Sequence, residues 1–464
     1  MKDKELYDAI TNVPDDLIVE AGNNKLKKRI PVWKYGVVAA ACLGLVIGIV
    51  LNFFPDNKVT FHENKIALKA IREVTSPKVY SFNDYDTRQV VMESNPVKDV
   101  FIDGLNQFAY KTTAELASKQ KGNLNYSPLS LYFALSIATV GANGQTQEEL
   151  MKLLEVPDRE TLLKQAGNLY RLLYMENEIG QCKIANSLWM DETVSWKNKF
   201  IEEVGKNLYA TVYSADFTSN ATAKAMANWI AQNTNGTLEP EIKFSGDQIL
   251  SILNTVYFYD EWTDRFDSKN TKEDMFYLSN GEKVSCDYMN KIYASAGFVK
   301  GDGYTLSSLG LKNQGKMTFI LPDEGVSAYE LLSSPQKIEE MLKNDNGKSG
   351  KVTWQVPKFS FGDSFELSDT LKSLGVTSAF DKDADFSNIT DNMSYISSIK
   401  QETHIGIDEK GVEASAYTQI DYCGGAMPED EAFMILNRPF IYVITSPYGA
   451  NLFIGICDNP TLSE

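Results

Sequence analysis

The chain has 464 residues, a formal net charge of −17, 43% hydrophobic residues and 23% charged residues. This length and apolar content suffice for a large buried core, in one large domain or in two to three ordinary ones. The acidic balance argues against binding to nucleic acid phosphates. The cysteines form no CxxC pair, which indicates isolated thiols rather than a disulfide framework: Cys42, Cys182, Cys286, Cys423 and Cys457.

Near the N-terminus, residues 33–54 form the apolar run WKYGVVAAACLGLVIGIVLNFF. A run of about 20 apolar residues matches the hydrocarbon thickness of a bilayer. The basic stretch KLKKR lies just before it, so the positive-inside rule predicts that residues 1–32 form a cytoplasmic tail. We therefore expect a single-pass transmembrane helix with the C-terminal part of the chain extracellular. A cleaved export signal, a lipoprotein signal ending at Cys42 and a buried helix are the alternatives.

Residues 55–95 show no strong periodicity and are interpreted as a spacer, with a domain beginning at about residue 96. Apolar spacing of three and four predicts helices, at 97–119, from Pro128 with Ser127 as N-cap, at 145–154 and at 223–234. Apolar and alternating runs predict strands, at 183–190, 249–259, 316–322, 351–361 and 439–445. Helices cluster early and strands later, which favours an α+β fold with large, mostly antiparallel sheets.

Catalytic motifs are not found. The chain has two histidines, and neither His62 nor His404 lies in HExxH or beside a GxSxG turn. Gly301–Gly303 is interpreted as a turn rather than part of a dinucleotide loop. The acidic segment 381–392 lacks the spacing of a calcium-binding EF-hand loop. We therefore expect no enzyme, no metal site and no cofactor.

The segment Asp408–Phe433, DEKGVEASAYTQIDYCGGAMPEDEAF, has the side-chain alternation of a strand, but it also contains the glycines, proline and acidic residues that are typical of a loop. From Val412 to Tyr422 every second residue is apolar or small, which is the period of a strand with one buried face. Gly411 precedes this run, and glycines, a proline and three acids follow it.

The part GIDEKGVEASAYT resembles the reactive-loop hinge of the serpins, the serine protease inhibitor family. Nine further segments resemble that family in the same order along the chain, beginning with NLNYSPLSLYFALSIATVGANGQTQEEL, ANSLWM, ANWIAQNTNGTLEPEI and LNTVYFYDEWTDRF. The others are MTFILPDEG with VPKFSF, LKSLGVTSAFDKDADFSNIT, ILNRPFIYVI and NLFIGICDNPT. The resemblance covers residues 96–464 and implies a serpin-like fold with a helical cluster and an exposed reactive loop at about 409–433.

The resemblance also assigns roles to individual residues. It implies a loop hinge at Glu409, Gly411, Val412, Glu413, Ala414, Ser415 and Ala416. It implies a structural "shutter" formed by Ser127, Ser130, Asn254 and Gln401. Gln401 stands where many family members have histidine, so we expect different hydrogen bonds there. Val412 stands where threonine or serine is usual.

By the same resemblance, the protein is a suicide substrate that traps a serine protease, or a cysteine protease, as an acyl-enzyme when the cleaved loop inserts into a sheet. Counting from the hinge places the scissile bond at Gly425–Ala426. The loop length also allows Tyr422, Cys423, Gly424 and Met427. Without Lys or Arg between Lys410 and Arg438, an elastase-, subtilisin- or chymotrypsin-like target is favoured over a trypsin-like one.

The alternative is a noninhibitory surface binding or sensor protein on the same fold. We expect a monomer whose partners are the target protease and, through the N-terminal helix, the membrane. The anchor and its basic flank indicate a bacterial protein that protects its own cell surface.

Overall fold

The computed structural model describes residues 70–244, 248–397, 399–412 and 430–462. These residues all belong to one unit, Ile66–Glu464. The predicted membrane segment 33–54 lies outside them. In the four described ranges, every helix is too short or too polar to cross a membrane.

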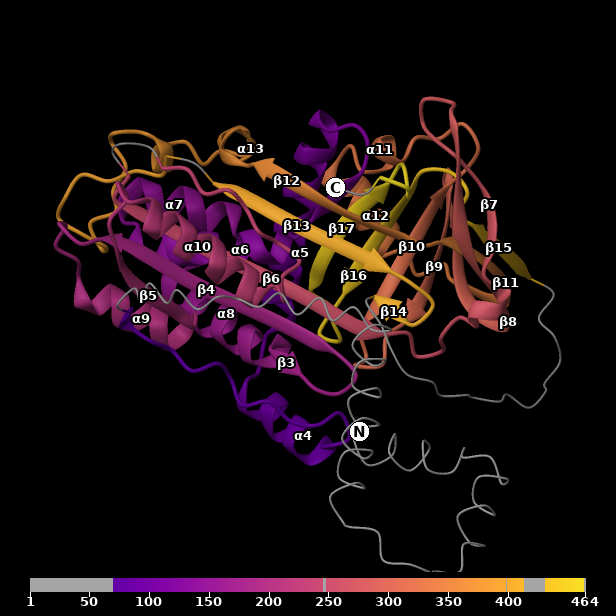
Figure 1. Cartoon of the computed structure of the whole chain (residues 1–464), viewed down its shortest axis with the longest axis horizontal. Coiled ribbons are helices and arrows are strands. Elements are labelled where there is room, and N and C mark those ends of the chain that lie inside the picture. Colours follow the sequence, from indigo (N-terminus) through magenta and orange to yellow (C-terminus); the bar gives the residue numbers. More distant parts are fainter. Residues whose placement is uncertain (1–69, 245–247, 398, 413–429, 463–464) are drawn as a thin grey trace, which may run out of the picture. The chain divides into compact units, whose positions relative to one another are not determined.

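The first sheet has the strand order β1-β5-β4-β6-β14, and β3 pairs with β4. Its strands are β1 (Ala70–Arg72), β3 (Met175–Glu176), β4 (Gln181–Asp191), β5 (Ala210–Ala215), β6 (Leu250–Glu261) and β14 (Gly411–Val412). A separate antiparallel pair consists of β12 (Phe359–Glu366) and β13 (Lys400–Ile407). In Figure 1 the long strands β4, β6 and β13 cross the middle of the domain on similar diagonals.

The second sheet has the order β15-β11-β8-β9-β10-β16-β17-β2, and β7 pairs with β8. Its strands are β2 (Leu124–Tyr126), β7 (Lys272–Tyr277), β8 (Lys283–Gly301), β9 (Tyr304–Gly310), β10 (Lys316–Pro322), β11 (Lys348–Pro357), β15 (Glu431–Ile435), β16 (Phe440–Thr445) and β17 (Asn451–Cys457). The β4–β5 and β11–β15 ladders are parallel, and the other ladders are antiparallel, as the sequence predicted.

Helices gather at the end of the domain opposite β7, β11 and β15 (Figure 1). They are α4 (Tyr85–Ser94), α5 (Asp99–Lys119), α6 (Pro128–Gly141), α7 (Gly144–Leu153), α8 (Arg159–Leu173), α9 (Asn198–Asn207) and α10 (Asn220–Asn233), with the shorter α11 (Ala328–Leu331), α12 (Pro335–Leu342) and α13 (Ser368–Ser373) elsewhere. Two short 3-10 turns are η1 (Ser268–Asn270) and η2 (Ser378–Phe380).

Helix α6 connects the two sheets, because it packs against both β6 and β17. All of its residues except Ala134 are buried, as expected for a helix that is apolar on every side. Its start follows the predicted pattern: Pro128 is the first helical residue, and the Ser127 hydroxyl accepts a hydrogen bond from the Ser130 N–H at 3.3 Å.

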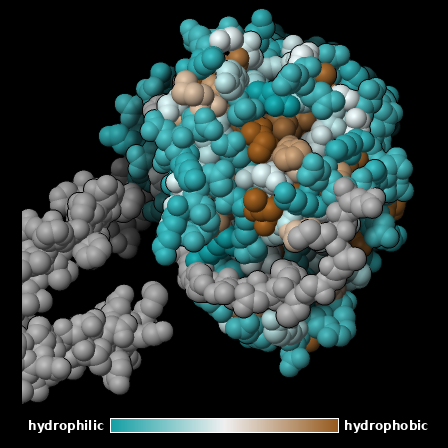
Figure 2. Space-filling view, turned by 90° about the vertical axis from the view of Figure 1, so that its right-hand side faces the viewer, coloured by the Kyte–Doolittle hydropathy of each residue, from teal (hydrophilic) through white to brown (hydrophobic). Residues whose placement is uncertain are grey.

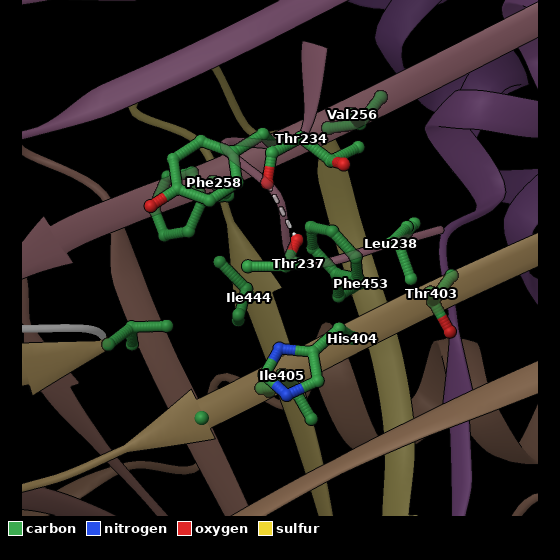
Figure 3. Close-up of a pocket in the computed structure, with 13 residues that line it drawn as sticks. Thr234, Thr237, Leu238, Val256, Phe258, Thr403, His404, Ile405, Ile444 and Phe453 are labelled. Carbon is green, nitrogen blue, oxygen red and sulfur yellow. Dashed lines mark hydrogen bonds between the residues drawn. The ribbon is translucent and has the colours of Figure 1, made fainter. Parts of the chain in front are cut away.

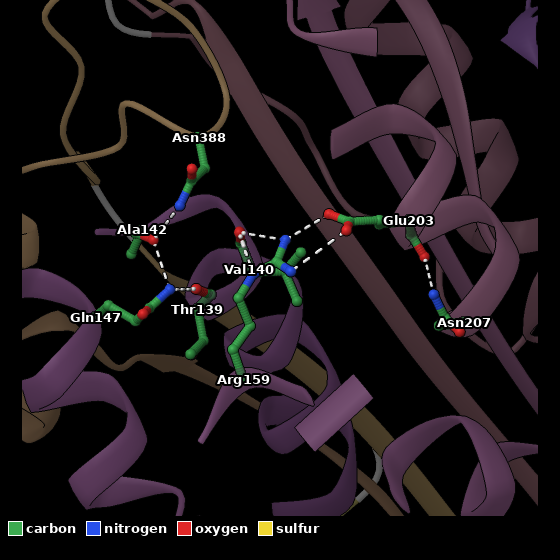
Figure 4. Close-up of polar contacts among 8 residues, drawn as sticks. All are labelled: Thr139, Val140, Ala142, Gln147, Arg159, Glu203, Asn207 and Asn388. Atoms are coloured by element: carbon green, nitrogen blue, oxygen red, sulfur yellow. Dashed lines mark hydrogen bonds and ion pairs between the residues drawn. The ribbon is translucent and has the colours of Figure 1, made fainter. Parts of the chain in front are cut away.

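The C-terminal end of α6 is held by side chains from neighbouring segments (Figure 4). Arg159 of α8 donates to the Val140 carbonyl at 3.2 Å and forms an ion pair with Glu203 of α9 at 2.5 Å. Gln147 of α7 and Asn388 donate to the Ala142 carbonyl at 2.7 and 2.8 Å. These contacts satisfy carbonyl groups that a buried helix end would otherwise leave unpaired.

The α+β class, the helices and most strands agree with the sequence prediction, and His404 lies in β13 as predicted for a strand residue. The prediction of one strand over 351–361 was wrong. Pro357 has no N–H to donate, and the chain passes at Lys358 from β11 to β12, which belong to different sheets. Within the proposed spacer 55–95, the structure describes β1, which pairs with β5, and the helix α4.

Candidate functional site

An opening separates β6 from β13, and within the described residues no ladder joins these two strands. We call it the β6–β13 gap. Its volume is about 500 Å³, including space open to solvent. Its lining comes from three places, as Figure 3 shows: Val256 and Phe258 of β6, Thr403 and Ile405 of β13, and Ile444 and Phe453 of the second sheet. Polar residues, among them Thr234, Thr237 and His404, line it as well. The gap is therefore of mixed polarity and lies between two strands with free ladder positions.

The chain reverses direction at one end of this gap. Beyond β13, the Asp408 N–H donates to the Gly411 carbonyl at 3.0 Å, and the Asp408 carboxylate accepts from the Lys410 N–H at 2.8 Å. After this turn β14 pairs antiparallel with β6, with Gly411 opposite Glu261 and Val412 opposite Asp260. The hinge thus begins a strand along β6 that points into the gap.

Gly411 is required here by a close approach of backbones. A Cβ on this residue would lie 2.3 Å from the Asp260 carbonyl oxygen and 2.7 Å from the Glu261 Cα. Both atoms belong to the backbone of β6, so neither can move without disturbing the strand. Val412, which is 3% exposed, then directs its side chain into the gap.

The turn itself is tied to the strand end by the buried Trp262. Its backbone N–H donates to the Lys410 carbonyl at 3.0 Å, and its indole N–H donates to the Asp408 carbonyl at 2.9 Å. The segment predicted as the start of the hinge is thereby held at the mouth of the gap.

Glu409 has two polar partners at the same place. Thr271 donates to its carboxylate at 2.7 Å, and the Lys358 ammonium lies 3.1 Å away. Burial raises the pKa of the Glu409 carboxyl, but these contacts outweigh burial and hold the pKa below its usual range. Glu409 therefore ties the hinge to Thr271, directly after η1, and to Lys358, between β11 and β12.

Two adjacent acids lie behind the hinge at the end of β6. Asp260 is 1% exposed, and its carboxylate accepts from the backbone and side chain of Asn313 at 3.1 and 2.9 Å. Burial raises the pKa of Asp260 to about 7. The fully buried Glu261 carboxylate pairs with Lys312 at 2.6 Å and with Arg265 at 2.7 Å.

The predicted shutter residues come together in part. The Gln401 amide accepts from the Ser127 N–H at 3.1 Å and donates to the Ser127 carbonyl at 2.9 Å, which fixes β13 to the start of α6. The Ser127 hydroxyl donates to the Leu452 carbonyl at 2.9 Å. Asn254 instead donates to Asn186 of β4 at 2.7 Å, so its amide is bonded within the first sheet.

Glu413, Ala414, Ser415 and Ala416 of the predicted hinge lie outside the described residues. So do all the candidates for the scissile bond: Tyr422, Cys423, Gly424, Gly425, Ala426 and Met427. Sequence analysis missed Asp260, Asn313 and Lys358. Two acids ending the apolar run ILSILNTVYFYDE, and a lysine directly after Pro357, were the available signals.

Comparison with known proteins decides the family. The model of the family described as serpin, the serine protease inhibitors, matches residues 103–460. The chain belongs to the serpin family. Serpins are inhibitors that bind target proteases and are not enzymes, so the absence of catalytic motifs is explained.

Several serpins are similar over most of their length. Serpin-Z7 of Hordeum vulgare is 30% identical over 368 residues, which are 74% of this chain and 91% of the relative. Human serpin B4 is 25% identical over 76% of this chain and 98% of its own length. The crystal structure of native tengpin, a thermophilic serpin, superposes with a TM-score of 0.72 at 26% identity, covering 84% of this chain and 99% of tengpin. The predicted fold is confirmed.

Proposed function

We propose that this serpin inhibits a protease by acting as its substrate. After cleavage, the part of the reactive loop (about 409–433) that precedes the cut inserts, over about residues 412–422, as a new strand into the β6–β13 gap. The observation that carries the proposal is the antiparallel pairing of Gly411 and Val412 with the end of β6. A strand continued from Val412 would have β6 on one side and β13 on the other, and both would offer ladder hydrogen bonds. Strand addition of this kind is the known behaviour of serpin loops.

Extending the observed register supports the proposal. With Val412 opposite Asp260, an antiparallel continuation brings Ala414 opposite Phe258 and Ala416 opposite Val256. These small side chains would meet the two larger ones that line the gap. The eleven residues 412–422 match β6, which has 12 residues, and the alternating pattern ends where β6 begins.

A polar position fits the same register. The side-chain oxygen of Asn254 is buried and has no hydrogen-bond partner among the residues that the structure describes. The continued strand would place Thr418 opposite Asn254, where the threonine hydroxyl can donate to that oxygen. Insertion would therefore satisfy a group that is otherwise unpaired.

The driving force is adequate for a mechanical trap. About ten new ladder hydrogen bonds at roughly 1 kcal/mol each, with several newly buried side chains, give on the order of 10–20 kcal/mol. Insertion of about eleven residues moves the cleaved end by roughly 37 Å along the sheet. A protease still joined by its acyl bond is carried with it, and distortion of its active site stops hydrolysis of that bond.

The loop composition indicates the target class. No lysine or arginine lies between Lys410 and Arg438, and Gly425–Ala426 is flanked by small residues. We infer cleavage by an elastase- or subtilisin-like enzyme, with a chymotrypsin-like enzyme acting at Tyr422 as the next choice.

The test is incubation of the full-length chain with elastase, subtilisin, chymotrypsin and trypsin, followed by denaturing gel electrophoresis. A stable band at the summed mass with an elastase- or subtilisin-like enzyme is expected. Complete cleavage without such a band, for every enzyme, would refute trapping and favour the noninhibitory alternative. An adduct with trypsin alone would refute the assignment of the target.

We also propose that residues 33–54 anchor the protein in a bacterial cell membrane, with residues 1–32 inside and the serpin domain outside. The apolar run and its basic N-terminal flank support this proposal. Protease added to intact cells should digest the serpin domain and leave a tag before residue 33 intact. A serpin domain found free in the medium without added protease, or digestion of the tag, would contradict this proposal.

A further inference from the structure

The outer end of the second sheet carries an exposed apolar row next to the reactive loop. Phe433 of β15 and Ile292 of β8 are 54% and 63% exposed. Both stand opposite Thr353 of β11 in their ladders, so the three side chains lie in one line on the same face of the sheet. Figure 2 views this end of the domain and shows a small apolar group surrounded by hydrophilic residues.

Charged residues around the row are largely neutralised by each other. Lys348 and Asp430 form an ion pair at 3.0 Å, and Lys351 stands opposite Glu431 in the β11–β15 ladder. An apolar centre with a polar border of balanced charge is the usual composition of a protein contact surface. It favours a partner that offers apolar contacts rather than a strongly charged patch.

The position of the row identifies the partner. Phe433 follows the scissile-bond candidate Ala426 by seven residues, so at most about 25 Å of extended chain separates them. A protease domain of about 250 residues has a radius of gyration of about 18 Å and is therefore about 45 Å across. An enzyme holding that bond in its active site must lie close to this face.

We propose that Phe433, Thr353 and Ile292 form a docking surface for the target protease, which contacts them with an apolar rim beside its active-site cleft. This inference rests on the proposed function, since the partner is the enzyme that cleaves the loop. Docking accelerates the encounter and has no part in insertion. The contact therefore affects how fast the loop is attacked and leaves the fate of the acyl-enzyme unchanged.

The test uses the full-length chain, the protease that attacks its loop fastest, and the variants Phe433→Ser, Ile292→Ser and their combination. Val100→Ser is the matched control, because Val100 is 71% exposed at the start of α5, beside α8. The rate constant for loss of intact chain, counting adduct and cleaved product together, measures docking. The fraction of attacked chains that form adduct measures trapping.

We expect the rate constant to fall about tenfold for each single variant and about a hundredfold for the pair, with an unchanged adduct fraction and no effect of Val100→Ser. Rates that match the unchanged chain, or that fall equally in the control, would overturn the docking surface while trapping stands. A steep loss of rate with added salt would also overturn it, since the contact is apolar. Slower attack without any adduct would support docking and refute trapping.

Discussion

A single methyl group at Gly411 should disable the trap. In Gly411→Ala the new Cβ would lie 2.3 Å from the Asp260 carbonyl oxygen, so β14 must move away from β6. The hinge would then lose two ladder hydrogen bonds at about 1 kcal/mol each and the burial of Val412, about 2 kcal/mol. The sum, about 4 kcal/mol, corresponds to roughly a thousandfold shift against the inserted hinge.

Because hydrolysis of the acyl bond competes with insertion, slower insertion converts inhibitor into ordinary substrate. Densitometry of the gel assay should show the adduct fraction of Gly411→Ala falling to a few per cent, with cleaved chain in its place. Gly297→Ala is the control, since a Cβ there would meet nothing within 4 Å. An adduct fraction equal to that of the unchanged chain, in a variant that still folds, would refute the role given to the β14–β6 pairing.

Three further changes test the polar contacts around the gap. Asp260 has a folded-state pKa raised from 3.8 to about 7, so the folded chain favours its protonated carboxyl. The contribution of this group to the free energy of unfolding is complete below about pH 4 and is lost as the pH rises through 7. In urea unfolding, the free energy of unfolding of the unchanged chain should fall by about 4 kcal/mol over this pH range, and Asp260→Asn should remove that fall. An equal pH dependence in the two proteins would contradict the role given to burial. Gln401→Ala leaves the Ser127 N–H unpaired and removes one of two donors to the Ser127 carbonyl, which still accepts from the Leu131 N–H. It should lower stability by about 2 kcal/mol in thermal unfolding, whereas an unchanged midpoint would show that water replaces the amide. Glu409→Gln removes the charge paired with Lys358, so the variant should melt at a lower temperature than the unchanged chain near neutral pH. This difference in melting temperature should disappear as the pH falls through the depressed pKa of Glu409. A difference that persists in acid would exclude the ion pair as its cause.

The sequence could predict those helices and strands whose formation depends on residues close to one another in the chain. Ser127 before Pro128 marked the start of α6, and a continuous apolar run marked β10, because caps and buried strands depend on near neighbours. The break at Lys358 was missed since Pro357 was taken as part of a continuous apolar run, and only the tertiary arrangement assigns the two halves to different sheets.

The candidate site shows the same division between local and distant information. Gly411 and Val412 were predicted as the hinge, and the structure adds that they pair with Asp260 and Glu261, about 150 residues earlier. Partners so far apart have no sequence spacing to reveal them. For the same reason the contact between Glu409 and Lys358 followed from no local pattern.

The central claim is that the cleaved loop becomes a strand between β6 and β13, and hydrogen exchange along these strands tests it most directly. The amides of Leu250–Glu261 that point toward the gap should exchange much more slowly after the loop is cut than before, as should those of Lys400–Ile407. Exchange rates that stay the same after complete cleavage would contradict insertion at this gap.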